Sequence, residues 1–187
     1  MKKSVTVKLV LCAMFTALTA IGAFIRIPVP GMDYFTLQFL FVLMAGMLLG
    51  SRNGAMAVGV YVLLGLAGLP IFAAGGGAAY IFRPSFGYLL GFIVAAFVTG
   101  LIVEKLKKRT FWGYLLAAFG GFFVTYGIGL VYKYFMLNYY VGEKTAFVMV
   151  ILDCFPLDMP GDVVLSIVSS LLAVRLVPAV ERIIIFT

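Results

Sequence analysis

Two carboxylates near the start of the last apolar segment, Asp158 and Asp162, are the best candidates for polar chemistry in this sequence. The run of uncharged residues between Asp162 and Arg175 would rise roughly 18 Å as a helix, whereas a bilayer core is about 30 Å thick. Arg175 has a long side chain that can reach the membrane surface, whereas the side chain of Asp162 is too short to do so. An ionised Asp deep in a span costs about 2.5–3.5 kcal/mol on insertion scales. We therefore expect Asp162 to face a polar cavity or a partner.

Structural and catalytic roles compete with this interpretation of the two acids. Pro160 suits the first turn of a helix, and acids in a first turn gain about 0.3–1 kcal/mol from the helix dipole. Capping therefore explains Asp158 better than it explains Asp162, which lies one turn deeper. A carboxylate pair can also do acid–base work or bind a metal. The sequence has no histidine and no further acid nearby on this helix, so an intramembrane enzyme is the disfavoured alternative.

Arg83 is the second charged candidate, because it separates a glycine-rich stretch from the uncharged run 84–103. A guanidinium there can hold an anionic ligand through paired hydrogen bonds, although an interfacial anchor or an ion pair with an acid remains open. Gly75, Gly76 and Gly77 precede it, and no Gly-Lys-Ser/Thr follows them, which excludes a phosphate loop. Glycines permit close backbone approach. They suit either a loop folded over a small ligand or a flexible connection.

Aromatic side chains gather around the same part of the predicted molecule. Most of them are typical of a belt at the membrane surface, and a few are candidates for the wall of an apolar pocket. The set comprises Tyr34, Tyr80, Phe82, Phe86, Tyr88, Tyr134, Tyr139 and Tyr140. The two cysteines, Cys12 and Cys154, lie in apolar surroundings and are expected to pack as small hydrophobes. Without histidine, a His/Cys zinc site and a Ser-His or Cys-His catalytic pair are excluded.

The elements that must position these residues are membrane-spanning helices. The chain has 187 residues, of which 64% are hydrophobic and 11% charged, whereas a soluble domain is about a quarter charged. Breakers and charges divide it into six apolar segments within one domain, residues 1–187. The sequence thus predicts an all-α integral membrane protein with six transmembrane helices. They cover roughly residues 5–24, 35–49, 54–68, 85–104, 111–137 and 159–182, with a tight turn at Gly50–Gly54 and a polar, aromatic link before the last helix.

The distribution of charge predicts the orientation of these helices. If the N-terminus is cytoplasmic, ten of the 14 basic residues fall on the cytoplasmic side, as the positive-inside rule favours. We therefore expect a multi-pass plasma-membrane protein with both termini in the cytoplasm. Five of the seven acids, including Asp33, then fall on the outer half with the longer connections. Longer structured loops are where binding sites are usually built.

Small residues on the first predicted helix form a possible contact strip. Ala13 and Ala17 are four residues apart, and small residues at this spacing let another helix approach closely. The residues alone leave open whether that helix belongs to this chain or to a partner. A channel or scaffold would need a polar pore-lining stripe or a large soluble region, and the sequence shows neither.

The chain resembles the BioY family, the biotin-specific substrate-binding subunits, or S components, of energy-coupling-factor (ECF) transporters. The resemblance covers nearly the whole chain and rests on the order of several short motifs. These are Ala17–Pro28, Thr36-Leu37-Gln38, Gly65–Phe72, the glycine run, Gly87–Phe92 and Pro160-Gly161-Asp162. It implies a six-helix, non-enzymatic subunit without a cofactor or metal, which captures biotin and partners a transmembrane coupling subunit and two ATP-hydrolysing subunits. It also implies that Ala13 and Ala17 contact the coupling subunit.

The resemblance places the vitamin site in the outer loops and at the start of the last helix. Asp162 would accept hydrogen bonds from the ureido N–H groups of biotin, and Arg83 would hold its carboxylate. Asp158, Phe82, Tyr88 and the backbone of Gly75, Gly76 and Gly77 would complete the site. One departure from the family pattern is Leu165, where a lysine often follows Asp162 by three positions. A related ligand such as dethiobiotin, lipoate or another vitamin therefore remains the alternative.

Overall fold

The computed structural model describes residues 2–28, 34–154 and 157–186, which form a bundle of α-helices. Asp33, one of the acids assigned above to the outer half, lies outside the described residues. The α-helices are α1 (Lys2–Phe24), α2 (Gln38–Leu66), α3 (Phe86–Lys105), α4 (Phe111–Phe135), α5 (Phe147–Cys154) and α6 (Asp158–Phe186). Shorter elements are the strands β1 (Arg26–Ile27) and β2 (Phe35–Thr36), a 3-10 helix at Ala78–Phe82, and a π-helical turn at Met136–Val141 that continues α4.

Helix α2 is a hairpin of two helical segments rather than one straight helix. Gly50 has a non-helical backbone conformation (φ 82°, ψ 174°) that interrupts it, and a positive φ favours glycine. The chain reverses there: a Cβ added to Gly54 would lie 2.8 Å from the Cα of Gly46, a residue that would be two helical turns away in a straight helix. Six membrane-crossing segments are thus present, as predicted, and the turn between the second and third needs only one non-helical residue.

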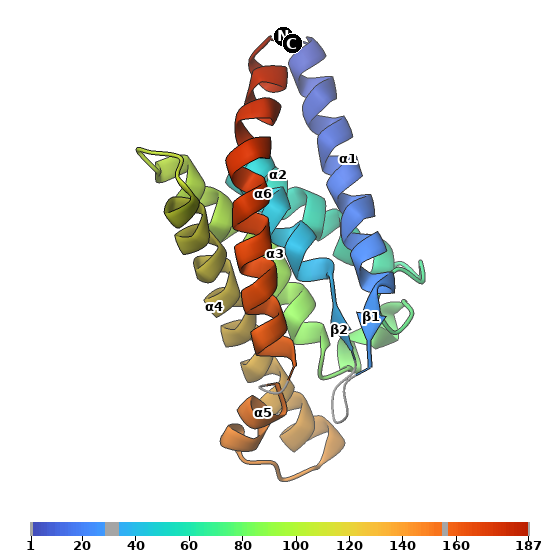
Figure 1. The fold of residues 1–187 in the computed structure, drawn as a ribbon. Helices are drawn as coiled ribbons and strands as arrows, with labels where there is room; N and C mark the ends of the chain where they lie inside the picture. Colours follow the sequence, from blue (N-terminus) through green and yellow to red (C-terminus); the bar gives the residue numbers. More distant parts are fainter. Residues whose placement is uncertain (1, 29–33, 155–156, 187) are drawn as a thin grey trace.

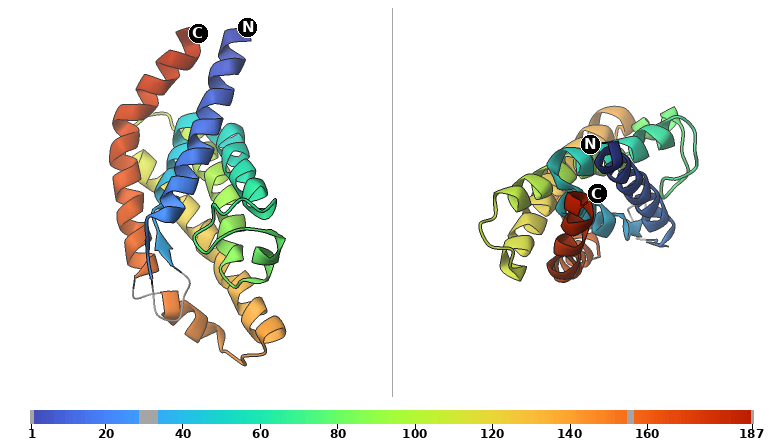
Figure 2. Two further views of the ribbon diagram at one scale, coloured as in Figure 1. Left: turned by 90° about the vertical axis from the view of Figure 1, so that its right-hand side faces the viewer. Right: turned by 90° about the horizontal axis from the view of Figure 1, so that it is seen from above.

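The helices form one layered bundle with both termini at the same end (Figures 1 and 2). Helix α3 packs between the α2 hairpin and α4, while α6 contacts both α2 and α4. Five helices of the described chain are long and apolar enough to span a membrane, namely α1, α2, α3, α4 with its continuation, and α6. The start of α6 lies at the end of the bundle opposite the termini (Figure 1), together with β1, β2 and α5.

Three short elements near this end were not predicted. β1 pairs with β2 antiparallel, with Arg26 opposite Thr36 and Ile27 opposite Phe35. Two-residue strands carry no periodicity, so a pattern-based prediction cannot detect them. Helix α5 lies in what was predicted as a polar, aromatic link, and eight residues are too few for a clear helical pattern. The last helix begins at Asp158, close to the predicted start.

Candidate ligand-binding site

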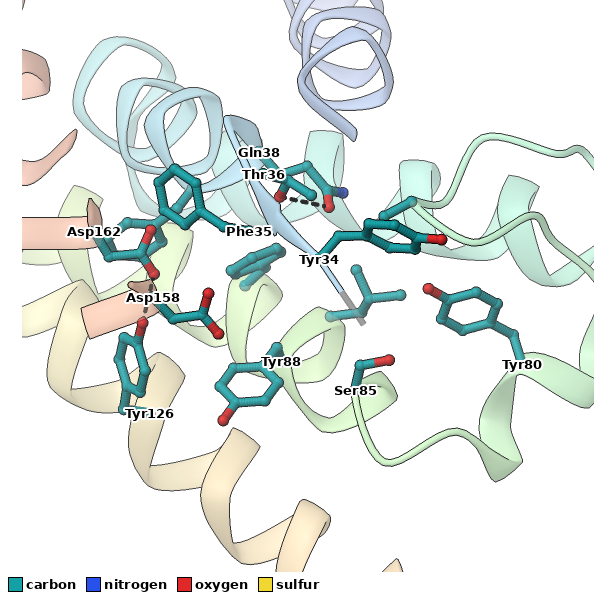
Figure 3. Close-up of a pocket in the computed structure, with 14 residues that line it drawn as sticks. Tyr34, Phe35, Thr36, Gln38, Tyr80, Ser85, Tyr88, Tyr126, Asp158 and Asp162 are labelled. Carbon is teal, nitrogen blue, oxygen red and sulfur yellow. Dashed lines mark hydrogen bonds between the residues drawn. The ribbon is translucent and has the colours of Figure 1, made fainter. Parts of the chain in front are cut away.

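A cavity opens beside β2 and the start of α6, at the end of the bundle opposite the termini (Figure 1). Figure 3 shows the residues that line it. Its space free of protein atoms, including the mouth, is about 620 Å³. It is lined from β2, the start of α2, the loop that follows α2, α3, α4 and α6. The lining residues are Tyr34, Phe35, Thr36, Gln38, Phe39, Ala73, Tyr80, Ser85, Tyr88, Leu89, Phe92, Tyr126, Asp158 and Asp162. Most of this wall is aromatic or aliphatic, with a few polar groups, as is usual for small-molecule sites.

The two carboxylates enter the cavity from the first turns of α6. Asp158 and Asp162 are one turn apart on the same helix face, and their residues are only 8% and 9% exposed. Tyr126 of α4 donates a hydrogen bond to Oδ2 of Asp162 (2.9 Å), which fixes that carboxylate against α4. Among the described residues, Oδ1 of Asp158 is buried and has no hydrogen-bond partner. A buried acceptor without a partner is unfavourable unless a ligand or water supplies a donor.

Two glycines allow aromatic rings to pack directly against the backbone of helices near these acids. Gly161 lies between the two carboxylates, and a Cβ there would meet the ring of Phe35 at 2.5 Å. Gly129 of α4 likewise leaves room for Tyr88, whose ring would be 2.4 Å from an added Cβ. The two glycines let Phe35 and Tyr88, which both line the cavity, pack directly on α6 and α4 respectively.

A second polar wall comes from β2 and the beginning of α2. Thr36 Oγ1 donates to Gln38 Oε1 (3.1 Å), and Gln38 Nε2 donates to the hydroxyl of Tyr61 (2.6 Å). Tyr61 in turn donates to the backbone carbonyl of Ile71 (3.1 Å). The chain of bonds runs from the cavity into the core, since Gln38 is 3% exposed and Tyr61 is fully buried.

Two arginines lie beside Tyr34 and Tyr80, the tyrosines on a third side of the cavity. The guanidinium carbon of Arg83 is 5.3 Å from the ring centre of Tyr80, and that of Arg26 is 4.5 Å from the ring centre of Tyr34. Arg26 also donates a hydrogen bond to the carbonyl of Ala73. Figure 3 shows Tyr34 and Tyr80 on the side of the cavity away from Asp158 and Asp162. The site is thus polarised, with anionic groups at one side and cations behind the other.

The structure brings together some of the residues predicted for the site and leaves others outside its lining. Asp158, Asp162 and Tyr88 all line the cavity, while Arg83 lies one contact away behind Tyr80. Phe82 does not line it: this residue is 53% exposed and stacks on Tyr140.

The three glycines after α2 also lie outside the lining of the cavity. Gly75 and Gly77 have positive φ angles, and Gly75 pairs with Phe72. A Cβ on Gly76 would meet the carbonyl oxygen of Leu69 at 2.1 Å. The run therefore turns tightly against the end of α2, with its backbone N–H at Gly77 bonded to Gly65.

Several residues of the site were not predicted from the sequence. Thr36 and Gln38 belong to one of the motifs that carried the family resemblance, so a signal for them existed. Tyr126 is one of many aromatic residues on α4, and only the three-dimensional contact with Asp162 distinguishes it. Ser85 lines the cavity from the turn before α3, and serine in a turn is too common to indicate a site.

Two further polar groups lie behind the cavity. Lys133 is 5% exposed, and its Nζ is 3.5 Å from Oδ2 of Asp153. Cys154, at the end of α5, is fully buried with its sulfur 3.1 Å from the hydroxyl of Tyr88. Burial raises the pKa of the Cys154 thiol above its ordinary value. This cysteine packs as predicted, and it directly supports a lining residue.

The small-residue strip of α1 faces away from the bundle. Ala13 and Ala17 are exposed, whereas Phe15 and Thr19 of the same helix are buried. Within the described chain no helix therefore packs over the two alanines.

Comparisons with known proteins agree on one family. The sequence model of the BioY family matches residues 1–182. A probable biotin transporter BioY of Lysinibacillus sphaericus is 43% identical, over 94% of this chain and 89% of the relative. The biotin transporter BioY of Thermotoga maritima is 41% identical, over 90% and 95% respectively. The fold matches the crystal structure of the S-component for biotin from an ECF-type ABC transporter, with TM-score 0.83, 26% identity, and coverage of 94% of this chain and 93% of that one.

Proposed function

This chain belongs to the BioY family, and we propose that it captures biotin as the S component of an ECF-type importer. It is a multi-pass membrane transport subunit and not an enzyme. The relatives that it resembles are likewise transporters. ATP hydrolysis then belongs to separate ATPase subunits, which act through a transmembrane coupling subunit. The bundle would hold both termini in the cytoplasm, so that the cavity at the opposite end opens outside the cell.

The buried Oδ1 of Asp158, without a hydrogen-bond partner among the described residues, is the observation that carries the site assignment. The ureido ring of biotin has two N–H donors and no charge, which suits a buried carboxylate that needs a donor. Asp162, already bonded to Tyr126, would place its second oxygen beside Asp158. The aromatic wall would cover the apolar thioether ring and the methylene chain of the ligand.

The polarity of the cavity supports a direction for the ligand. With its ureido ring at the carboxylates, the chain of biotin would extend toward Tyr80, where Arg83 can pair with the ligand carboxylate. A guanidinium binds a carboxylate through two parallel hydrogen bonds. Leu165, which replaces the lysine often found in the family, is buried in the apolar core. The cations near the proposed carboxylate end are therefore Arg83 and Arg26, from other parts of the chain.

Equilibrium binding of radiolabelled biotin to the purified chain, without ATP or other subunits, tests this proposal. Asp158→Asn and Asp162→Asn should each weaken binding about 10- to 100-fold, the effect of losing a hydrogen bond to a charged group. Arg83→Ala should weaken biotin but not biotinamide, which lacks the carboxylate. Glu143→Gln is the matched control, because this exposed acid lies outside the cavity lining.

The possible outcomes separate the function from the site. If the wild-type chain does not bind biotin but binds dethiobiotin or lipoate, the ligand assignment is wrong. If biotin binds and the Asp158, Asp162 and Arg83 variants match wild type, the assignment of these residues to the site is wrong.

A further inference from the structure

The hydrogen-bond chain from Thr36 to Ile71 has only one possible direction. The carbonyl of Ile71 can only accept, so the hydroxyl of Tyr61 must donate to it. Having one hydrogen, that hydroxyl must then accept from Gln38, which fixes the amide nitrogen of Gln38 toward Tyr61. The amide oxygen of Gln38 is left on the side of Thr36, whose hydroxyl has to donate to it. A backbone carbonyl in the loop after α2 thus sets the orientation of a side chain in the cavity.

This direction determines what the wall offers a ligand. Thr36 has given its single hydrogen to Gln38, so its oxygen can only accept from a ligand. The amide oxygen of Gln38 retains a second lone pair. Both residues line the cavity, on a different side from Asp158 (Figure 3). The two polar walls of the cavity therefore present acceptors: carboxylate oxygens from α6, and neutral oxygens from β2 and α2.

We propose that Thr36 and Gln38 form a second acceptor wall for the ligand, which selects a ring with N–H donors on two sides. The inference rests on the proposed biotin site: a cyclic urea has two N–H groups that diverge from one carbonyl, one for each wall. Asp158 and Asp162 receive one N–H, and Thr36 and Gln38 receive the other. Tyr61 does not touch the ligand; it is a positioning residue that keeps the amide of Gln38 from turning its donors toward the N–H.

A cycle that combines protein variants with two ligand isomers tests this assignment. The ligands are biotin and its two N-methyl derivatives, each methylated on one ureido nitrogen. Wild-type protein should bind both derivatives more weakly than biotin. In Gln38→Met, which keeps the side-chain length, biotin should bind about 5- to 20-fold more weakly through loss of one buried hydrogen bond. Methylation weakens binding by the ratio of the Kd of the derivative to the Kd of biotin. For one of the two isomers only, this ratio should be smaller in Gln38→Met than in wild type, by a similar factor.

Asp158→Asn changes the other polar wall of the cavity. In this variant, methylation of the other ureido nitrogen should weaken binding less than it does in wild type. Tyr61→Phe keeps the ring and should reproduce the isomer preference of Gln38→Met in weaker form. Equal thermal stability of the variants without biotin separates these effects from misfolding, and with biotin the weaker-binding variants should be stabilised less than wild type. If the penalties for both isomers are unchanged in Gln38→Met, the second acceptor wall is refuted. If wild-type protein does not bind biotin, the proposed function fails first, and the two results are distinguishable.

Discussion

At the scale of single residues, the site depends on which carboxylate oxygen already has a partner. The sequence favours Asp162 as the binding group, because it lies deeper in the last span, and it explains Asp158 by capping. In the structure Tyr126 already donates to Asp162, while one oxygen of Asp158 has no partner among the described residues. Charge and depth can be read from the sequence. The occupancy of a lone pair depends on a contact between α4 and α6, and no local pattern encodes it.

Cys154 offers a residue-scale test of the packing behind the cavity. Its burial raises the thiol pKa above the ordinary value, and only the thiolate reacts with alkylating reagents. In the Cys12→Ser variant, maleimide labelling of Cys154 at neutral pH should therefore be much slower than labelling of a free thiol. The rate should keep rising with pH beyond the ordinary thiol pKa, where the rate of a free thiol levels off, because the raised pKa moves this plateau to higher pH.

Mass spectrometry of samples quenched over a pH series gives this rate, and the unfolded protein supplies the reference. Labelling of the folded protein at the unfolded rate near neutral pH would contradict the close contact between Cys154 and Tyr88.

At the scale of elements, the sequence predicts the helices better than the loops. Long apolar runs bounded by charges and Pro or Gly indicate the helices. The turn was predicted over Gly50–Gly54, and in the structure only its first residue, Gly50, is non-helical. The pair β1 and β2 and helix α5 are too short for a periodic signal, although they shape the cavity end. The glycine run at 75–77 shows the same limit: its composition permits a ligand loop or a tight turn, and its backbone contacts in the structure are those of a turn.

The hairpin of α2 leads to a stability prediction with an internal control. Gly54 packs against the backbone of Ala45 and Gly46, with only 2.8 Å to an added Cβ. Backbone atoms cannot move aside cheaply, so Gly54→Ala should destabilise the protein by about 1–3 kcal/mol, as overpacking does. Gly59→Ala lies in the same helical segment with nothing within 4 Å of an added Cβ.

This control should be neutral or slightly stabilising, since Ala favours a helix more than Gly does. Thermal unfolding in detergent, followed by size-exclusion chromatography, compares the two variants. Equal melting temperatures would mean that the two segments are less closely packed than described.

At the scale of the whole molecule, the prediction of an all-α membrane protein with six membrane-crossing segments is confirmed by the fold and its similarity to an S component. That residues 1–187 form a single domain stays a prediction. Composition alone is sufficient to predict an integral membrane protein, because so apolar a chain needs lipid as its solvent. The side of the membrane that each end faces follows from charge distribution and remains a prediction. The assembly with other subunits depends on surfaces, and the exposed strip at Ala13 and Ala17 is the candidate for it.

Leucine substitutions in this strip separate binding from transport. Ala13→Leu with Ala17→Leu should leave biotin binding by the isolated chain unchanged, because both residues are exposed and lie outside the cavity lining. Uptake of biotin by cells that supply the coupling and ATPase subunits should fall at least about tenfold, since close helix approach needs small residues. Gly127→Leu is the control: an exposed position on α4 with open space around it. Equal uptake by the two variants would exclude the strip as the contact with the coupling subunit.

The helical hairpin also gives the molecule unequal hydrophobic thickness. Its segments, residues 38–49 and 51–66, rise about 18 and 24 Å, whereas the apolar span of α1, Val5–Phe24, has 20 residues and rises about 30 Å. A bilayer that matches α1 is too thick for the hairpin, and such mismatch costs fractions of a kcal/mol per ångström. Lipids beside the hairpin must therefore compress or the protein must tilt. We therefore expect the preferred tilt of this subunit in the membrane to change with the acyl-chain length of the lipids.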